Sequence, residues 1–138
     1  MSCLFCQIAD KTLPAHVVFD EPEVVAFLDK TPLFFGHVLV VPRKHVVTLD
    51  ALDAELIAPL FASVQRVMRA VVKATGAQGT FVAANNVVSQ SVPHLHVHVV
   101  PRTKGDGLKG FFWPRQKYKD DAAMGQVAAN IRAALAAP

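Results

Sequence analysis

Five short segments of the chain are dominated by apolar and β-branched residues, as β-strands are. Turn-forming residues bound them, including Pro22, Gly36 and Pro42. The connections between the first three are too short for a helical crossover, so we expect these strands to pair antiparallel. The segments are residues 17–19, 24–28, 37–41, 80–85 and 95–100.

Two longer segments repeat apolar residues at three- and four-residue steps, which predicts amphipathic helices. The first lies between Asp53, which can cap a helix start, and Gly76, which suits a helix end. Pro59 lies inside this pattern and predicts either a later start or a kink in the first turns. The second segment is residues 120–136. The whole pattern predicts an α+β fold: an antiparallel five-stranded sheet with one long helix and a C-terminal helix.

Composition narrows the function classes. The 138 residues suffice for one domain with one sizeable core, and 52% hydrophobic with 18% charged residues exclude a disordered chain. The net charge of +3 suits an anionic ligand, but the chain has no basic cluster of the kind that binds nucleic acid. No secretory signal and no apolar run of membrane-spanning length is visible. We therefore expect a cytoplasmic protein without nucleic-acid or membrane partners.

Three of the six histidines alternate with apolar residues, at His94, His96 and His98. In a strand, alternate side chains share a face, which places these imidazoles in a row at a spacing of about 7 Å. Such a row can bind a metal, donate to phosphate oxygens or supply a nucleophile. The alternative without a function is a polar strand face turned to water. Three histidines on one strand diverge too much to suit a single tetrahedral ion.

Cys3 and Cys6 are the only cysteines. At that spacing, in a chain without an export signal, the residues favour reduced thiols or a metal site over a structural disulfide. A zinc site would need two further ligands.

Residues 89–102, which read SQSVPHLHVHVVPR, resemble the histidine triad (HIT) family of nucleotide hydrolases and transferases, as do residues 27–29 and 36–42. The family signature is His-x-His-x-His followed by apolar residues, often preceded by Gly-Gln-x-Val. Ser89 stands where the family usually has glycine, which would allow a positive φ. The resemblance implies a single HIT domain over residues 1–138, with a core at 1–105, a C-terminal loop and helix at 106–138, and a homodimer.

The resemblance also implies a role for each residue of the phosphate site. His96 matches the nucleophile, which forms a nucleotidyl-histidine intermediate, and His98 matches a phosphate contact. Gln90 and Ser91 match contacts to phosphate and leaving group, and Asn85 is a further candidate polar contact. Trp113 and Pro114 match a Trp-Pro pair in the tail of one branch, and Trp113 could equally contact substrate, contact a dimer partner or cover the core.

The nucleoside and metal sites follow from the same resemblance. Asp29 matches the residue that binds the ribose hydroxyls. His37 either orients a triad histidine or is structural. Bacterial-type members with an N-terminal Cys-x-x-Cys bind zinc, which here implies a structural site with four protein ligands. The base cleft would be formed by Phe5, Ile8, Leu13 and Phe27, and the zinc ligands would be Cys3, Cys6, His45 and His94.

The activity implied is cleavage of the bond between a nucleoside 5′-monophosphate, preferably a purine nucleotide, and its leaving group. That group would be the amine of a phosphoramidate or the further phosphate chain of a dinucleoside polyphosphate. Two alternatives stay open at this point. One is a dinucleoside polyphosphate phosphorylase or nucleotidyl transferase, and the other is a nucleotide-binding regulatory protein with little turnover.

Overall fold

The computed structural model describes residues 3–108 and 115–137, so Trp113 and Pro114 lie outside the described residues. The described residues divide into two compact units, one that ends at residue 106 and one that begins at residue 107. No helix among the described residues is long and apolar enough to cross a membrane. The elements are α1 (Leu4–Ala9), β1 (Val17–Asp20), β2 (Val24–Leu28), β3 (Val38–Pro42), a 3-10 turn (Leu49–Ala51), α2 (Ala54–Thr75), β4 (Gly79–Ala83), β5 (Val97–Arg102) and α3 (Asp121–Ala136).

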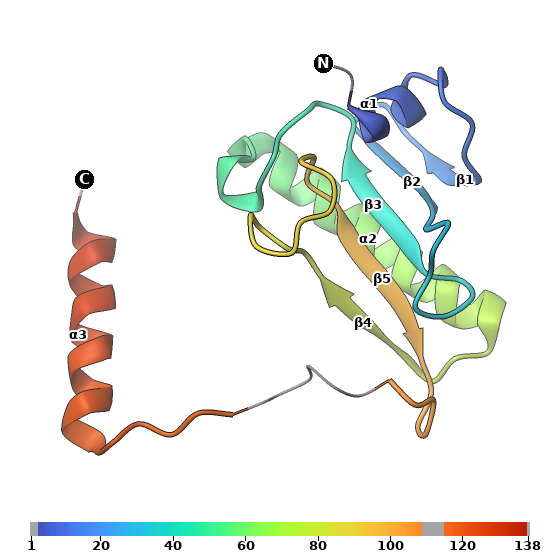
Figure 1. The fold of residues 1–138 in the computed structure, drawn as a ribbon. Helices are drawn as coiled ribbons and strands as arrows, with labels where there is room; N and C mark the ends of the chain where they lie inside the picture. Colours follow the sequence, from blue (N-terminus) through green and yellow to red (C-terminus); the bar gives the residue numbers. More distant parts are fainter. Residues whose placement is uncertain (1–2, 109–114, 138) are drawn as a thin grey trace. The chain divides into compact units, whose positions relative to one another are not determined.

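The sheet is antiparallel throughout, in the order β1-β2-β3-β5-β4, and α2 covers one of its faces (Figure 1). The predicted α+β fold is therefore confirmed. The short connections of β1, β2 and β3 produce the antiparallel pairs expected of them. The pair β3–β5 brings Leu39 opposite His98, which joins the first half of the chain to the histidine strand.

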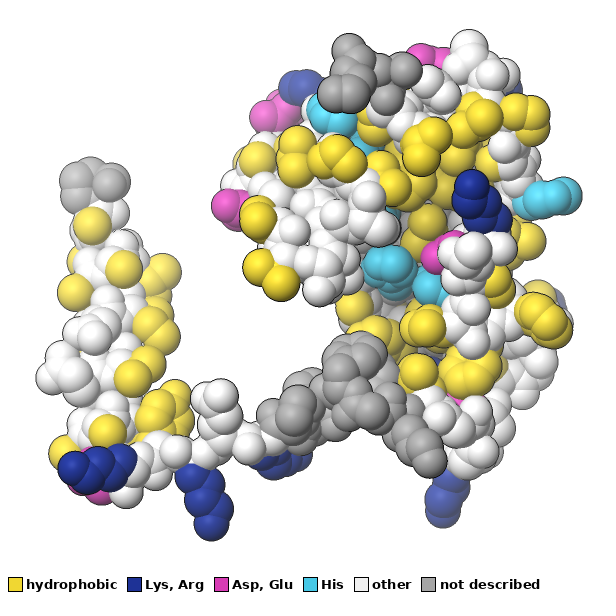
Figure 2. Space-filling view, in the orientation of Figure 1, with side chains coloured by type: hydrophobic (Ala, Val, Ile, Leu, Met, Phe, Trp, Pro, Cys, Tyr) yellow, Lys and Arg dark blue, Asp and Glu magenta, His cyan; other side chains and the backbone are white. Residues whose placement is uncertain are grey.

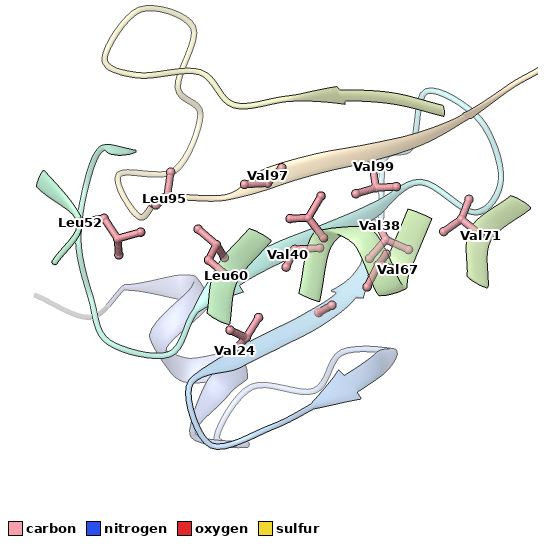
Figure 3. Packing of buried hydrophobic residues seen from close by; sticks show 12 residues of the cluster. Val24, Val38, Val40, Leu52, Leu60, Val67, Val71, Leu95, Val97 and Val99 are labelled. Atoms are coloured by element: carbon pink, nitrogen blue, oxygen red, sulfur yellow. The ribbon is translucent and has the colours of Figure 1, made fainter. Parts of the chain in front are cut away.

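Alternation along the strands divides the apolar residues between two cores. On β2, Val24 and Ala26 face α2, whereas Val25 and Phe27 pack on the opposite face with α1. The core beneath α2 also takes Leu95, Val97 and Val99 from the histidine segment. Figure 3 shows this core, in which Leu60 and Val67 of α2 meet the strand residues. Because these apolar partners take one face, His96 and His98 are directed to the α1 face.

Details of the helices differ from the sequence pattern. Helix α2 begins at Ala54 and includes Pro59, so the late start is wrong. Asp53 makes no side-chain capping bond, because its carboxylate pairs with Lys44 at 2.6 Å instead. Gly76 ends α2 with φ +74, and α3 begins after Asp120, which accepts a hydrogen bond from the Ala123 amide at 2.8 Å. Both of those ends are as predicted.

The loop between β2 and β3 depends on Gly36. Its φ is +99, and a Cβ built there would lie 2.7 Å from Thr75 Cγ2 at the end of α2. Only glycine combines this left-handed backbone with so close an approach. The loop is thereby held against α2, and the next residue, His37, is directed into the α1 face of the sheet.

Candidate active site and metal centre

A cavity of about 780 Å³ lies on the α1 face of the sheet. Residues from α1, from the segments flanking β1 and β2, and from the histidine strand line it. Figure 2 shows histidine side chains set among hydrophobic ones on this side of the molecule. Nine of the predicted site residues line the cavity: Phe5, Ile8, Leu13, Phe27, Asp29, His37, Ser91, His96 and His98.

His96 is held in one tautomer. It is only 3% exposed, and its Nδ1 lies 2.7 Å from the backbone carbonyl oxygen of His94. A carbonyl oxygen only accepts hydrogen bonds, so Nδ1 carries the proton and Nε2 keeps its lone pair. The ring of Phe5 packs edge-on against the imidazole, with centroids 5.0 Å apart. His96 therefore presents an unprotonated nitrogen on a fixed ring, which a nucleophile needs.

A second chain of hydrogen bonds sets the proton of His98. The Leu33 amide donates to His37 Nδ1 at 3.1 Å, so the proton of His37 is on Nε2. That N–H lies 2.9 Å from His98 Nδ1, which accepts it and leaves the His98 proton on Nε2. Asp29 Oδ2 lies 3.7 Å from His37 Nε2. Because the proton on His37 Nε2 is donated to His98, His37 and His98 form a hydrogen-bonded pair rather than metal ligands, and the Asp29 carboxylate lies beside them without a hydrogen bond to either.

Both histidines of this chain are neutral at physiological pH. Burial, reinforced by the neighbouring His96 and His37, lowers the pKa of His98 to about 4. Burial also lowers the pKa of His37, against the opposing effect of Asp29. A neutral His98 still donates a hydrogen bond through Nε2.

Asp29 has one oxygen engaged and one available. Its Oδ1 accepts from the Thr31 amide at 2.9 Å and from the Thr31 hydroxyl at 3.2 Å. These bonds fix the carboxylate at the cavity wall just after β2. The remaining oxygen can accept from sugar hydroxyls.

Hydrogen bonds of Gln90 hold the loop before the histidine strand. Gln90 accepts from the Val87 amide at 3.0 Å and donates to the Val47 carbonyl at 2.6 Å, and it does not line the cavity. Asn85 is exposed and does not line the cavity either. Ser89 has φ +62, in the left-handed region that glycine favours, so this chain keeps the backbone without the glycine. Val87, with φ +70, shares that strain.

Several cavity residues were not singled out from the sequence. His16 lines the cavity although it is exposed. Thr31 lines the cavity and holds Asp29 through its backbone amide and hydroxyl, and Leu33, outside the lining, holds His37 through its backbone amide. A backbone amide carries no residue-type signal. Lys30 is the one lysine or arginine among the described residues that line the cavity, and its place directly after Asp29 was the available clue.

The predicted zinc ligands come together outside this cavity. One ligand atom from each of Cys3, Cys6, His45 and His94 lies within 4.8 Å of the others. The two Nδ1 atoms are 3.2 Å apart, and Sγ–Nδ1 distances are 3.3 to 3.5 Å. Tetrahedral zinc with ordinary bond lengths would separate two nitrogens by about 3.3 Å and sulfur from nitrogen by about 3.6 Å. The donor set and its spacing both fit zinc.

The protonation states at this cluster also suit a cation. His94 Nε2 lies 2.8 Å from the Pro42 carbonyl oxygen, so Nε2 carries the proton and Nδ1 offers its lone pair to the cluster. Burial and the neighbouring Cys3 raise the pKa of the Cys6 thiol to about 11 in the metal-free protein. Zinc would reverse that, because a coordinating thiol loses its proton to the ion's charge.

A family model and several similar proteins point to the same family. The HIT domain model matches residues 10–105. A HIT-like protein of Methanocaldococcus jannaschii is 38% identical over 107 residues, 76% of this chain and 82% of that protein. An adenosine 5′-monophosphoramidase of Schizosaccharomyces pombe is 32% identical over 116 residues, 83% of this chain and 84% of that protein. An adenylylsulfatase of Arabidopsis thaliana is 32% identical over 108 residues, 77% of this chain and 55% of that protein.

Solved structures extend the likeness over nearly the whole chain. A Streptococcus mutans protein superposes with a TM-score of 0.89 at 36% identity, covering 97% of this chain and 85% of that one. A zinc-bound histidine triad family protein of Mycobacterium smegmatis superposes with a TM-score of 0.74 at 33% identity, covering 94% of this chain and 98% of that one.

Proposed function

Because this chain belongs to the HIT family, we propose that it is a nucleotide hydrolase. Its substrate is a nucleoside 5′-monophosphate joined to a leaving group, and the reaction passes through a nucleotidyl-histidine intermediate on His96. The observation that carries the proposal is the bond from His96 Nδ1 to the His94 carbonyl, which leaves Nε2 free to attack phosphorus. Two relatives named for cleaving an adenosine phosphoramidate and an adenylyl sulfate support the substrate class.

The proposed chemistry has two displacements. His96 Nε2 attacks the α-phosphorus, the bond from phosphorus to the leaving group breaks, and the leaving group takes up a proton from solvent. Water then attacks the same phosphorus and gives up a proton to solvent, the bond to His96 breaks, and the nucleoside monophosphate leaves. His98, through its Nε2–H, donates to the phosphoryl oxygens, and the Ser91 hydroxyl orients the leaving group. Gln90 acts indirectly, since its bonds hold the loop that carries Ser91.

The other cavity residues are proposed to bind the nucleoside or to position His98. A purine base packs in the apolar cleft of Phe5, Ile8, Leu13 and Phe27, and the ribose hydroxyls bind Asp29. His37 is a positioning residue for His98, because its Nε2–H sets the tautomer. Asn85 is proposed as an outer polar contact. The protein is proposed to act as a homodimer, with residues 106–138 as an extension of the core at 1–105.

We propose a structural zinc ion held by Cys3, Cys6, His45 and His94. Four protein ligands leave no open position, so the ion would supply cross-linking and no substrate activation. It would join α1 to the segment after β3 and to the start of the histidine strand.

A substrate panel tests the activity. Purified protein is given adenosine and guanosine phosphoramidates, diadenosine polyphosphates and adenylyl sulfate, with and without inorganic phosphate, and the substrates are ranked by kcat/KM. We expect AMP or GMP as the product whether or not phosphate is present. A nucleoside diphosphate that forms only with phosphate would identify a phosphorylase, and tight AMP binding without turnover would identify a binding protein.

Acid is expected to destabilise the protein through His98. The pKa of His98 is about 4 in the folded protein and 6.5 ordinarily. Between these two pH values His98 is therefore protonated in the unfolded chain and neutral in the folded protein. The stabilisation is present above the unfolded pKa and is lost as the pH falls through this window. Urea unfolding near pH 7.5 and about pH 5 should show a larger loss of stability for the wild type than for His98→Asn. Equal losses would contradict the assignment, and both proteins share the same metal ligands.

A further inference from the structure

The proposed zinc cluster and the nucleophile share one residue. His94 is fully buried and offers its Nδ1 to the cluster, while its own backbone carbonyl accepts the Nδ1 proton of His96 at 2.7 Å. Its Nε2 is fixed to the Pro42 carbonyl. Any movement of the His94 main chain therefore moves the acceptor that sets the ring orientation of His96.

Helix α1 makes a second connection between the cluster and His96. It has six residues, against the roughly 12–15 that an isolated helix needs in water, so its place depends on tertiary contacts. Cys3 and Cys6 flank Phe5 at its first turn. The Phe5 ring lies 5.0 Å from the ring of His96 and 5.2 Å from that of Phe27, edge-on to both. Whatever holds the two cysteines thus holds Phe5 against the nucleophile.

Apolar packing also holds α1, since its Phe5 and Ala9 share a buried core with β2 and β3, and the cluster adds polar contacts at the first turn. The far end of α1 is tied by Arg43, which donates to the Ala9 carbonyl at 2.7 Å, but its first turn meets the β5 side through the cysteine and histidine side chains. His45 approaches the cluster from the loop after β3 and is itself exposed, outside the substrate cavity. Three separate segments of the chain therefore converge on the cluster directly beside His96.

We propose that Cys3, Cys6, His45 and His94 are positioning residues for His96, so that closing their cluster with zinc orients the nucleophile as well as stabilising the fold. This inference rests on the proposed function. Opening the cluster should lower kcat more than it weakens nucleotide binding, because Phe27 on β2, Asp29 just after β2 and Leu13 before β1 lie outside the cluster and still hold the nucleoside.

The test uses His45, because it belongs to the cluster and does not line the cavity. His45→Ala should lose zinc and lower kcat by about tenfold to 100-fold, while the Kd for AMP changes several-fold less. His45→Cys, which restores a zinc ligand, should recover both zinc content and kcat. Lys44→Ala, next door and outside both sites, is the matched control.

A spectroscopic readout is independent of turnover. In the zinc-loaded protein the hydrogen-bonded Nδ1 proton of His96 should give a slowly exchanging NMR signal, which His45→Ala or a chelator should weaken and His45→Cys should retain. If His45→Ala unfolds, chelator titration of the wild type, with the fold followed by circular dichroism, replaces it. A protein that loses zinc but keeps kcat and the signal, or that holds much less than one zinc per chain, overturns the inference. Absence of turnover on every substrate defeats the proposed function instead, and the NMR signal still decides the positioning role.

Discussion

Replacing His96 by alanine should lower kcat by about 10⁴-fold or more, the scale on which enzymes lose rate when a covalent nucleophile is removed. The variant lacks the nitrogen proposed to attack phosphorus, and neither neighbouring histidine, His98 on the triad strand or His37 just before β3, offers a free lone pair in its place. His98 carries a proton on Nε2 and accepts a hydrogen bond at Nδ1, and both ring nitrogens of His37 are in hydrogen bonds. Steady-state turnover of the best substrate of the panel measures the loss.

Binding provides the control for that experiment. The base cleft and Asp29 remain in the His96→Ala variant, so calorimetry should give an AMP affinity within about threefold of the wild type, a change below 1 kcal/mol. Rapid quenching of the wild type with labelled substrate should trap a protein-bound nucleotide, and the variant should trap none. Turnover that survives the substitution would refute the nucleophile assignment.

The second large effect is expected from the metal cluster. Cys3→Ser should remove zinc and lower the free energy of unfolding by about 3 kcal/mol or more, with a fall in Tm of about 10 °C. A ligand that crosses from α1 to the histidine strand is lost, and α1 is too short to hold itself. Thermal unfolding with metal analysis on the same sample measures both quantities.

A chelator separates metal loss from altered packing. In chelator the wild type should fall to about the Tm of Cys3→Ser, and the variant should hardly change. A variant that unfolds at the wild-type temperature, or a wild type that chelator leaves unaffected, would count against a zinc site.

Much of the fold follows from local patterns in the sequence. Runs of apolar and β-branched residues between turn formers predicted the strands, and the helical period predicted α2 and α3, because both signals depend on residues a few positions apart. The same alternation placed His96 and His98 on one face, opposite Val97 and Val99. Helix α1 was missed, since six residues are too few to show a helical period.

The site was predicted less completely, for a physical reason. The contact of Gln90 with phosphate stays a prediction, and in the folded chain its amide bonds Val87 in its own loop and Val47 in the segment after β3. Asp53 was expected to cap a helix, but Lys44 takes its carboxylate. In both cases a residue type offers several hydrogen bonds, and only the folded arrangement selects among them.

The sequence by itself determined the strand and helix periods, the row of histidines with one apolar face behind it, and the residue types that could hold a metal. Tertiary structure decided how those groups work. The tautomers of His96 and His98 depend on a carbonyl and on His37, and the cluster unites Cys3 with His94, 91 residues away. Periodicity is a property of neighbours along the chain, whereas proton positions and ligand sets depend on contacts that exist only after the sheet has paired.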